Sequence, residues 1–312
     1  TDDGPGIDSL FTRSDHQERM RRFDAEYLTN TRRGMWEDSR GALSPLDLST
    51  RERVLDVGSG TGALTRVLRE ETSGNVIAVD ADPQGGMTLK LGHRERYREH
   101  DDTLFDVLAD VGELNYGDLG ELVLVGDEFD LIPASLKNFV LEKHLHTDRR
   151  GTESLALALD ESGLDDAYDY IVIDTPPNLG PLADGSILAA ENVLFPTRVN
   201  VIARDSLEIL FDEIDTLEAE FECSVTTAGA VLNEVPAQGN IAAELEAWFV
   251  ETFGEEFVFE IPDRDAVEHA IEYRTSVFAY DADDAGYPWD SDPIADLRDQ
   301  YDQIAAHLEE TL

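Results

Sequence analysis

The fold class that this sequence predicts is α/β, with a mostly parallel sheet covered by helices on both faces. Two observations support this prediction. From Arg53 onward, short apolar runs alternate with longer stretches whose apolar residues recur at helical spacing. The short runs are apolar throughout instead of alternating with polar residues, which is typical of parallel strands that are buried on both faces.

The elements follow one another in a regular order. Strands are predicted over residues 53–57, 75–80, 129–135, 170–174, 192–196, 228–232 and 257–261. Helices are predicted over 62–71, 205–221 and 240–253, and a polar loop over 280–293 precedes a terminal helix. Ahead of them, "SDHQ" at Ser14–Gln17 forms a capping box for a helix that ends near Gly34. We therefore expect a helical N-terminal extension over 1–50 and a single α/β domain over 51–312.

The charge of the chain is extreme. It has 68 Asp+Glu against 24 Lys+Arg, a formal charge of −44, and its only lysines are Lys90, Lys137 and Lys143. Acid spread through a chain that is 41% hydrophobic indicates a fold built for high salt, because salt screens the self-repulsion. We therefore expect a cytoplasmic protein of a halophile. The same charge disfavours DNA binding, because DNA phosphates are repelled.

Two other classes of protein are excluded by composition. No apolar run approaches the roughly 18 to 20 residues of a membrane span, and no apolar leader opens the sequence, so we expect no membrane span and no export. The single cysteine, Cys223, excludes an intrachain disulfide and a cysteine-built metal site.

A glycine-rich loop, "LDVGSGTG" at residues 55–62, lies between the first predicted strand and its helix. Glycines let the backbone approach a ligand closely, and the helix N-terminus offers unpaired N–H groups. The loop fits a dinucleotide fingerprint loosely. It is more similar to motif I of class I S-adenosylmethionine-dependent methyltransferases, and this resemblance covers residues 1–82. It implies an S-adenosylmethionine site at Asp56, Gly58, Gly60, Gly62 and Asp80, with Asp80 binding the ribose.

The same loop does not make a P-loop. When G-x-x-x-x-G-K-[ST] is laid on the segment from Gly58, Ala63 takes the place of the second glycine, Leu64 that of the lysine and Thr65 that of the hydroxyl residue. Leucine brings no positive charge to the β and γ phosphates. No lysine precedes Lys90, so the sequence supplies no P-loop lysine.

From about residue 79 to 312 the sequence resembles the ParA/MinD family of P-loop ATPases, which partition chromosomes and plasmids or position cell machinery. The motifs that carry the resemblance are "DADPQGGMT", "EFDLIPAS", "YDYIVIDTPPNLGPLADGSILAAENVLFP" and "AGAVLNEV". The resemblance implies that Asp82 is catalytic and orients the attacking water, that Asp174 is the Walker B acid behind a magnesium shell, and that Asn233 and Pro262 flank adenine.

The resemblance also implies cofactors and partners. It implies Mg²⁺ with ATP or ADP, a homodimer and a partition partner protein. Magnesium prefers carboxylate, hydroxyl and phosphate oxygens, which Asp174 and Thr65 are able to supply. A second, signature lysine of the family's loop corresponds to Ser59 here. Since phosphoryl transfer depends on positive charge around the transferred group, we expect weak nucleotide binding and impaired hydrolysis.

The two resemblances imply different sheets. In a methyltransferase the strand ending in Asp80 lies next to the glycine-loop strand, whereas in a ParA-type sheet the Walker B strand separates them. We expect the ParA-type order, with "RVLDV" in the first-strand position.

Three functional hypotheses remain from the sequence. The leading one is a ParA/MinD-like nucleotide-binding protein in a P-loop NTPase/Rossmann-like fold, methyltransferase-like over 51–82 and ParA-like over 83–312. The alternative is an S-adenosylmethionine-dependent methyltransferase, and the third is an inactive fusion of the two.

Overall fold

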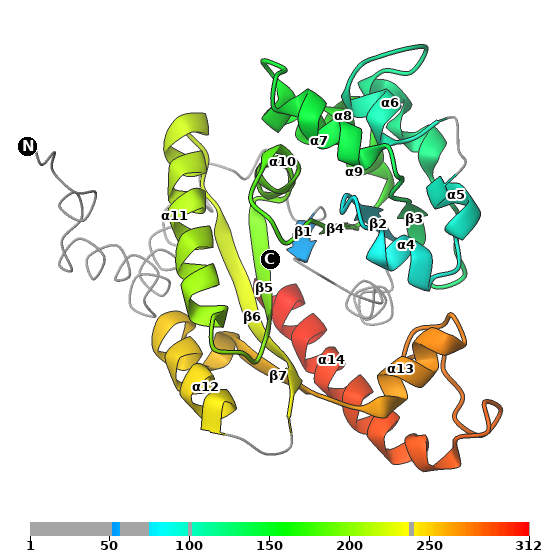
Figure 1. Ribbon diagram of the computed structural model, residues 1–312, viewed down its shortest axis with the longest axis vertical. Coiled ribbons are helices and arrows are strands. Elements are labelled where there is room, and N and C mark those ends of the chain that lie inside the picture. The colour runs from blue at the N-terminus through cyan, green and yellow to red at the C-terminus, as the bar shows by residue number, and fades with distance from the viewer. Residues whose placement is uncertain (1–51, 57–74, 99–101, 237–239, 312) are drawn as a thin grey trace, which may run out of the picture.

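The computed structural model describes residues 52–56, 75–98, 102–236 and 240–311 (Figure 1). Its strands form one parallel sheet of seven strands in the order β3-β2-β4-β1-β5-β6-β7. Their bounds are β1 Glu52–Asp56, β2 Val76–Asp80, β3 Asp130–Ile132, β4 Tyr170–Asp174, β5 Asn192–Arg198, β6 Thr226–Val235 and β7 Val258–Pro262. All seven predicted strands are therefore present, and the predicted α/β class is confirmed.

Helices connect the strands and cover the sheet. In the first half these are α4 Gly86–Lys90, α5 Arg94–Arg98, α6 Leu104–Leu108, η3 Tyr116–Leu122, α7 Asn138–Leu145, η4 Gly151–Glu153, α8 Ser154–Ser162 and α9 Leu164–Ala167. In the second half they are α10 Pro181–Ala190, α11 Ala203–Phe221, α12 Asn240–Phe253, η5 Glu255–Phe257, α13 Asp265–Glu272, η6 Pro288–Asp290 and α14 Ser291–Thr311. Among the described residues, no helix combines the length and apolarity needed to cross a bilayer.

Alternate residues of each strand face two separate apolar layers. In β2, Ile77 and Val79 pack into the layer covered by α6, α7, α8, α10, α11 and α12. Val76 and Ala78 pack into the opposite layer, with α4, α13 and α14. Because parallel strands bury both faces, this arrangement explains why the strands read as continuous apolar runs. Figure 1 shows α11 and α12 on one side of β5, β6 and β7, with α14 on the other.

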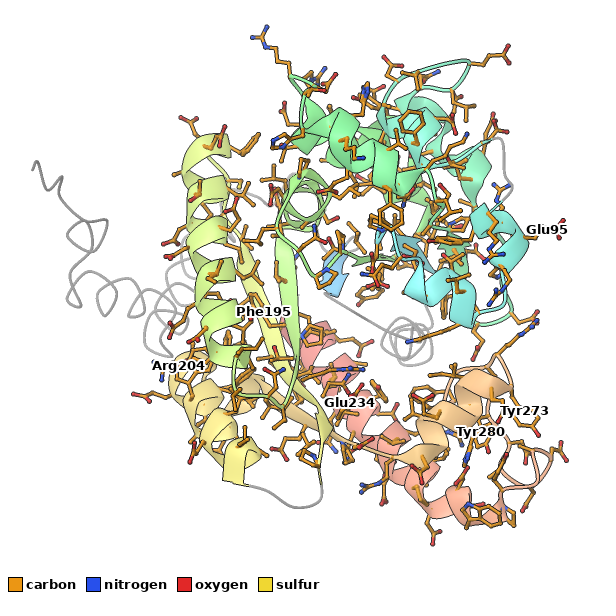
Figure 2. The ribbon with its side chains drawn as sticks, viewed as in Figure 1. Glu95, Phe195, Arg204, Glu234, Tyr273 and Tyr280 are labelled. Atoms are coloured by element: carbon orange, nitrogen blue, oxygen red, sulfur yellow. The ribbon has the colours of Figure 1, made fainter. Side chains whose placement is uncertain are left out.

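A cluster of aromatic rings fastens α11 and α12 to the sheet. Phe195 of β5, labelled in Figure 2, lies with its ring centroid 5.4 Å from that of Phe211 on α11 and 5.6 Å from that of Phe253 on α12. Phe253 also contacts Phe249, at 5.5 Å, and both are 0% exposed. Large rings at helical spacing in α11 and α12 therefore bury against one strand, and this holds the second half of the sheet in place.

The strand order decides between the two sheets that the sequence allowed. β4 lies between β1 and β2 and is paired with both. This is the ParA-type order with "RVLDV" in the first-strand position, as expected. The adjacent placement of β1 and β2 that a methyltransferase requires is wrong for this chain. The predicted N-terminal helix and the helix over 62–71 lie outside the described residues.

Candidate functional site

Three neighbouring strands each end in an aspartate at the same level of the sheet. Asp174 at the end of β4 is in register with Asp80 of β2 on one side and with Asp56 of β1 on the other. Asp80 is 0% exposed and Asp174 is 4% exposed. The carboxyl ends of parallel strands are where ligands bind in open α/β sheets, so this edge is the candidate site.

Asp80 serves as a buried structural acceptor. Its Oδ2 accepts a hydrogen bond from the main-chain N–H of Thr88, at 2.8 Å, and one from the Thr88 hydroxyl, at 2.5 Å. The same hydroxyl accepts from the N–H of Ala134 beyond β3, at 2.9 Å. Burial raises the pKa of Asp80 to about 6 against the hydrogen bonds from Thr88, which lower it, and the charge of Asp82 adds to the rise.

This environment argues against the ribose-binding role that the methyltransferase resemblance implied for Asp80. The side chain has no exposed surface, and one of its oxygens is committed to Thr88. Its other oxygen, Oδ1, is buried without a hydrogen-bond partner. The sequence motifs do not identify Thr88, eight residues after Asp80, as a partner of that carboxylate. A hydroxyl residue early in the helix that follows the strand is nevertheless a signal of a hydrogen bond to the aspartate at the end of the strand.

Asp82 lies in a tightly held loop directly after β2. Its Oδ1 accepts from the N–H of Gln84, at 2.9 Å, and its carbonyl accepts from the N–H of Gly85, also at 2.9 Å. Gly85 has φ +62°, a left-handed conformation that suits glycine, and a Cβ there would lie 2.5 Å from the Tyr97 ring. The Tyr97 hydroxyl donates to the carbonyl of Pro83 at 2.8 Å. These contacts hold Asp82 in one position, and burial raises its pKa.

Asp174 and Thr175 complete the described part of the site. The carbonyl of Asp174 accepts from the N–H of Ala81, at 2.8 Å, which ties the ends of β4 and β2 together. The hydroxyl oxygen of Thr175 is buried without a hydrogen-bond partner. A buried unpaired hydroxyl beside two buried carboxylates fits a ligand or hydrated metal ion at this edge, because such a group is costly when it is left unsatisfied.

The two residues expected to flank adenine lie close together at the far part of the same edge. Asn233 is near the end of β6, and Pro262 ends β7, where it is in register with Val235 of β6. The Oδ1 of Asn233 accepts from the N–H of Glu234, at 3.0 Å. Glu234, labelled in Figure 2, forms an ion pair with Arg198 at the end of β5. The fold thus brings both predicted residues to the carboxyl edge, two and three strands from β1.

Part of the expected site falls outside the described residues. These residues are Gly58, Gly60, Gly62 and Thr65. The strand that precedes them in the chain, β1, lies between β4 and β5. Among the described residues, no group of three or more His, Cys, Asp or Glu side chains forms a metal cage.

Comparisons with known proteins identify relatives of this chain. The sequence profile of the AAA domain family matches residues 58–227. The chromosome partitioning protein ParA of Caulobacter vibrioides is 28% identical over 214 residues, which are 68% of this chain and 78% of the relative. The sporulation initiation inhibitor protein Soj of Bacillus subtilis is 27% identical over 170 residues, 54% of this chain and 64% of the relative.

Solved structures share the fold. McdA of Cyanothece, in a complex with ATP, superposes with a TM-score of 0.65 at 21% identity and covers 83% of this chain and 96% of its own. A plasmid partition protein of Borrelia burgdorferi bound to AMPPNP gives 0.65 at 16% identity, with coverage of 84% and 100%. Cobyrinic acid a,c-diamide synthase of Mycobacterium smegmatis, with ADP and magnesium, gives 0.58 at 22% identity, with coverage of 72% and 91%.

Proposed function

Because the chain belongs to the AAA domain family, as a relative of the ParA and Soj partition ATPases, we propose that it is a ParA/MinD-like nucleotide-binding protein of the partition or positioning class, with impaired ATP hydrolysis. The observation that carries this proposal is the carboxyl edge of the sheet. Asp174 stands there between β1 and β2, with Asp82 in the loop after β2 and the adenine-side residues Asn233 and Pro262 on β6 and β7.

Each residue of the site has a role in this proposal. Asp174, through the magnesium water shell, and the hydroxyl of Thr65 would hold Mg²⁺, which supplies positive charge to the phosphates when it is bound. The unpaired hydroxyl of Thr175 is placed to receive a hydrogen bond from that shell. Asp82 is held by Gln84 and Gly85 in one orientation, which suits a carboxylate that aligns an attacking water.

The absent lysines limit the chemistry. Ser59 and Leu64 stand where the family's loop carries its two lysines, in a chain of formal charge −44. The metal is then the main counter-charge for the bound phosphates, so nucleotide binding should depend strongly on Mg²⁺. Hydrolysis should be slow because neither of these two loop positions supplies a cation to stabilise the charge that develops on the transferred phosphoryl group.

Binding experiments in molar KCl test the proposal. We expect a thermal shift with Mg²⁺ and ATP, and we expect EDTA to remove this shift. Asp174→Asn should lower the affinity for Mg²⁺ with ATP by about tenfold or more. Asp160→Asn, at an exposed position of α8, makes the same change of charge away from the site and should leave affinity unchanged. A thermal shift with S-adenosylhomocysteine and none with ATP would overturn the proposal, and a response to neither ligand would indicate an inactive protein.

Restoring the lysines tests the second half of the proposal. The double variant Ser59→Lys and Leu64→Lys should hydrolyse ATP faster than the wild-type chain, because it returns both cations to the loop. A wild-type rate equal to that of the double variant, with both rates well above the background without protein, would refute impaired hydrolysis.

Self-association is part of the same proposal. Four exposed apolar side chains follow the carboxyl ends of β3 and β4, and they offer a surface for a second copy or a partner protein: Leu136, Phe139, Val140 and Leu179, which are 47%, 49%, 53% and 41% exposed. Without the lysines, we expect ATP to be a weak promoter of dimers. Light scattering that detects ATP-dependent dimers of the wild-type chain in molar KCl would contradict this expectation.

A further inference from the structure

The end of β6 carries an irregularity at one of the residues expected to flank adenine. β6 and β7 are in register as far as Leu232 and again from Val235, and a shift separates the two stretches. Asn233 and Glu234 lie within the shift, where two residues of β6 face one residue of β7. Such an extra residue is a β-bulge, which bends a strand, re-aims its side chains and is common next to active sites. The bulge therefore sets the direction of the Asn233 side chain.

Glu234 has an unusual backbone conformation within this bulge. Its φ is +54°, in the left-handed region, which glycine and asparagine adopt more readily than glutamate does. A residue in such a conformation persists only when its surroundings hold it there, and residues of this kind cluster at binding sites. Glycine would meet the backbone requirement at lower cost, so a glutamate at this position indicates a role for the side chain.

The Glu234 side chain reaches back to the neighbouring strand. Its Oε1 forms an ion pair with Nη2 of Arg198, the last residue of β5. Arg198 is also the residue of β5 that is in register with Asn233. The carbonyl of Arg198 accepts a hydrogen bond from Nδ2 of Asn200, at 3.2 Å, and Oδ1 of Asn200 accepts from the N–H of Ile202, at 3.0 Å. The ion pair therefore joins the bulge to a hydrogen-bonded turn at the end of β5.

The backbone of the bulge in turn holds the side chain of Asn233. Oδ1 of Asn233 accepts from the N–H of Glu234, at 3.0 Å. Because the oxygen is engaged in this way, the NH₂ group is the half of the amide that remains to bind a ligand. In the described part of the chain, this NH₂ group has no hydrogen-bond partner. Asn233 thus offers a donor at the carboxyl edge of the sheet, and the ring nitrogens of adenine are acceptors.

We propose that Glu234 and Arg198 are positioning residues, which hold the bulge so that the NH₂ group of Asn233 donates a hydrogen bond to the base of the nucleotide. The ion pair holds the backbone of Glu234, and the N–H of Glu234 holds the amide oxygen of Asn233. Both charged residues therefore act on the base only through Asn233. The contact with the base rests on the proposed function, whereas the holding of Asn233 does not.

The affinity for Mg²⁺ with ATP, measured in molar KCl, tests the contact with the base. The side chains of Arg198 and Glu234 are 72% and 43% exposed, so the ion pair is of the surface kind. Glu234→Gln and Arg198→Gln should each lower the affinity by about threefold to fivefold, the upper range for such a pair. The two changes together should lower it no further, because both remove the same contact. In an Asn233→Ala background neither change should have an effect, because the hydrogen bond to the base is already absent.

Two further variants separate the ion pair from backbone conformation and from charge alone. Glu234→Gly suits the left-handed conformation but removes the side chain, and it should lower the affinity as Glu234→Gln does. The matched control is Glu208→Gln, which removes the same charge from a surface ion pair within α11, where Oε1 of Glu208 lies 2.8 Å from Nε of Arg204. This control should leave the affinity unchanged.

Three results would overturn the contact with the base. The first is an affinity that Glu234→Gln leaves unchanged. The second is an equal loss with and without the Asn233 side chain, which would mean that Glu234 or Arg198 acts on the nucleotide by another route. The third is an equal loss in Glu208→Gln, which would assign the effect to net charge.

Amide hydrogen exchange, measured by NMR without ligand, tests the holding of Asn233. The protection of the Glu234 N–H should fall in Asn233→Ala, which lacks the acceptor, and in Arg198→Gln, which releases the bulge, and it should not change in Glu208→Gln. Unchanged protection in Asn233→Ala or Arg198→Gln would overturn the holding. If the wild-type chain does not bind ATP, the proposed function fails together with the contact to the base, and the exchange result still decides the holding of Asn233.

Discussion

Replacing Thr88 by valine removes the hydroxyl that joins three parts of the candidate site. That hydroxyl donates to Oδ2 of Asp80, at 2.5 Å, and accepts from the N–H of Ala134, at 2.9 Å. Thr88, Asp80 and Ala134 are each 0% exposed, so water cannot replace the lost contacts without rearrangement. Valine keeps the shape of threonine, and the substitution therefore changes hydrogen bonding with little change in packing.

The magnitude follows from the two lost contacts. A hydrogen bond to a charged acceptor contributes about 1.5 to 3 kcal/mol, and a buried N–H left without a partner costs about 1 to 3 kcal/mol. We therefore expect Thr88→Val to lower the free energy of unfolding by about 4 kcal/mol at pH 8, where Asp80 is ionised. At pH 5 the Asp80 carboxyl is mostly protonated, since burial raises its pKa to about 6, and a loss of about 2 to 3 kcal/mol is expected.

The pH dependence of the wild-type chain provides the reference. The raised pKa of Asp80 means that the folded chain keeps a proton which the unfolded chain releases near pH 4. The stability is therefore full below pH 4 and falls as the pH rises through about 6, by about 3 kcal/mol for a shift of about two pKa units. Thr88→Val removes the contact that most lowers this pKa, so the fall extends to higher pH.

Urea unfolding in molar KCl at pH 5 and pH 8 measures these free energies. Thr88→Ser is the matched control, because it keeps the hydroxyl and loses only a methyl group, at about 1 kcal/mol. The reasoning is refuted if Thr88→Val is as stable as Thr88→Ser at pH 8, or if its loss of stability is the same at both pH values.

Three further predictions concern the fold. Gly85→Ala should lower the free energy of unfolding by about 2 to 4 kcal/mol, because φ is +62° and the new Cβ meets the Tyr97 ring. Gly86→Ala, with open space around it, should be neutral or stabilising, and equal stabilities of the two variants in urea unfolding would contradict the prediction. Phe253→Ala should lower the free energy of unfolding by about 3 to 5 kcal/mol in the same measurement, because it leaves a cavity beside Phe195, Phe211 and Phe249. The control Ile209→Ala, at a position 58% exposed, should change the free energy of unfolding little. The melting temperature should rise with KCl concentration because salt screens the formal charge of −44, and a melting temperature that does not change with KCl would reject a high-salt fold.

Much of the local structure is predictable from the sequence because it depends on neighbours in the chain. Continuous apolar runs located all seven strands, although β3 is limited to Asp130–Ile132 and β6 extends to Thr226–Val235. Helical spacing located α12 at its observed bounds, Asn240–Phe253. The position of each aspartate at a strand end also follows from the sequence, since the end of an apolar run marks the edge of the sheet.

What the sequence by itself determined is therefore the seven strands, their parallel arrangement, the long helices α11, α12 and α14, and the residues at the edge of the sheet. It left two strand orders open, because the stretch around Asp80 suits the second strand of either family. Only the pairing of β4 with both β1 and β2 decided between them. The contact of Thr88 with Asp80 was likewise decided by tertiary structure. Periodicity indicates that a side chain is buried, but the partner it meets there depends on how helices far apart in the sequence pack on the sheet.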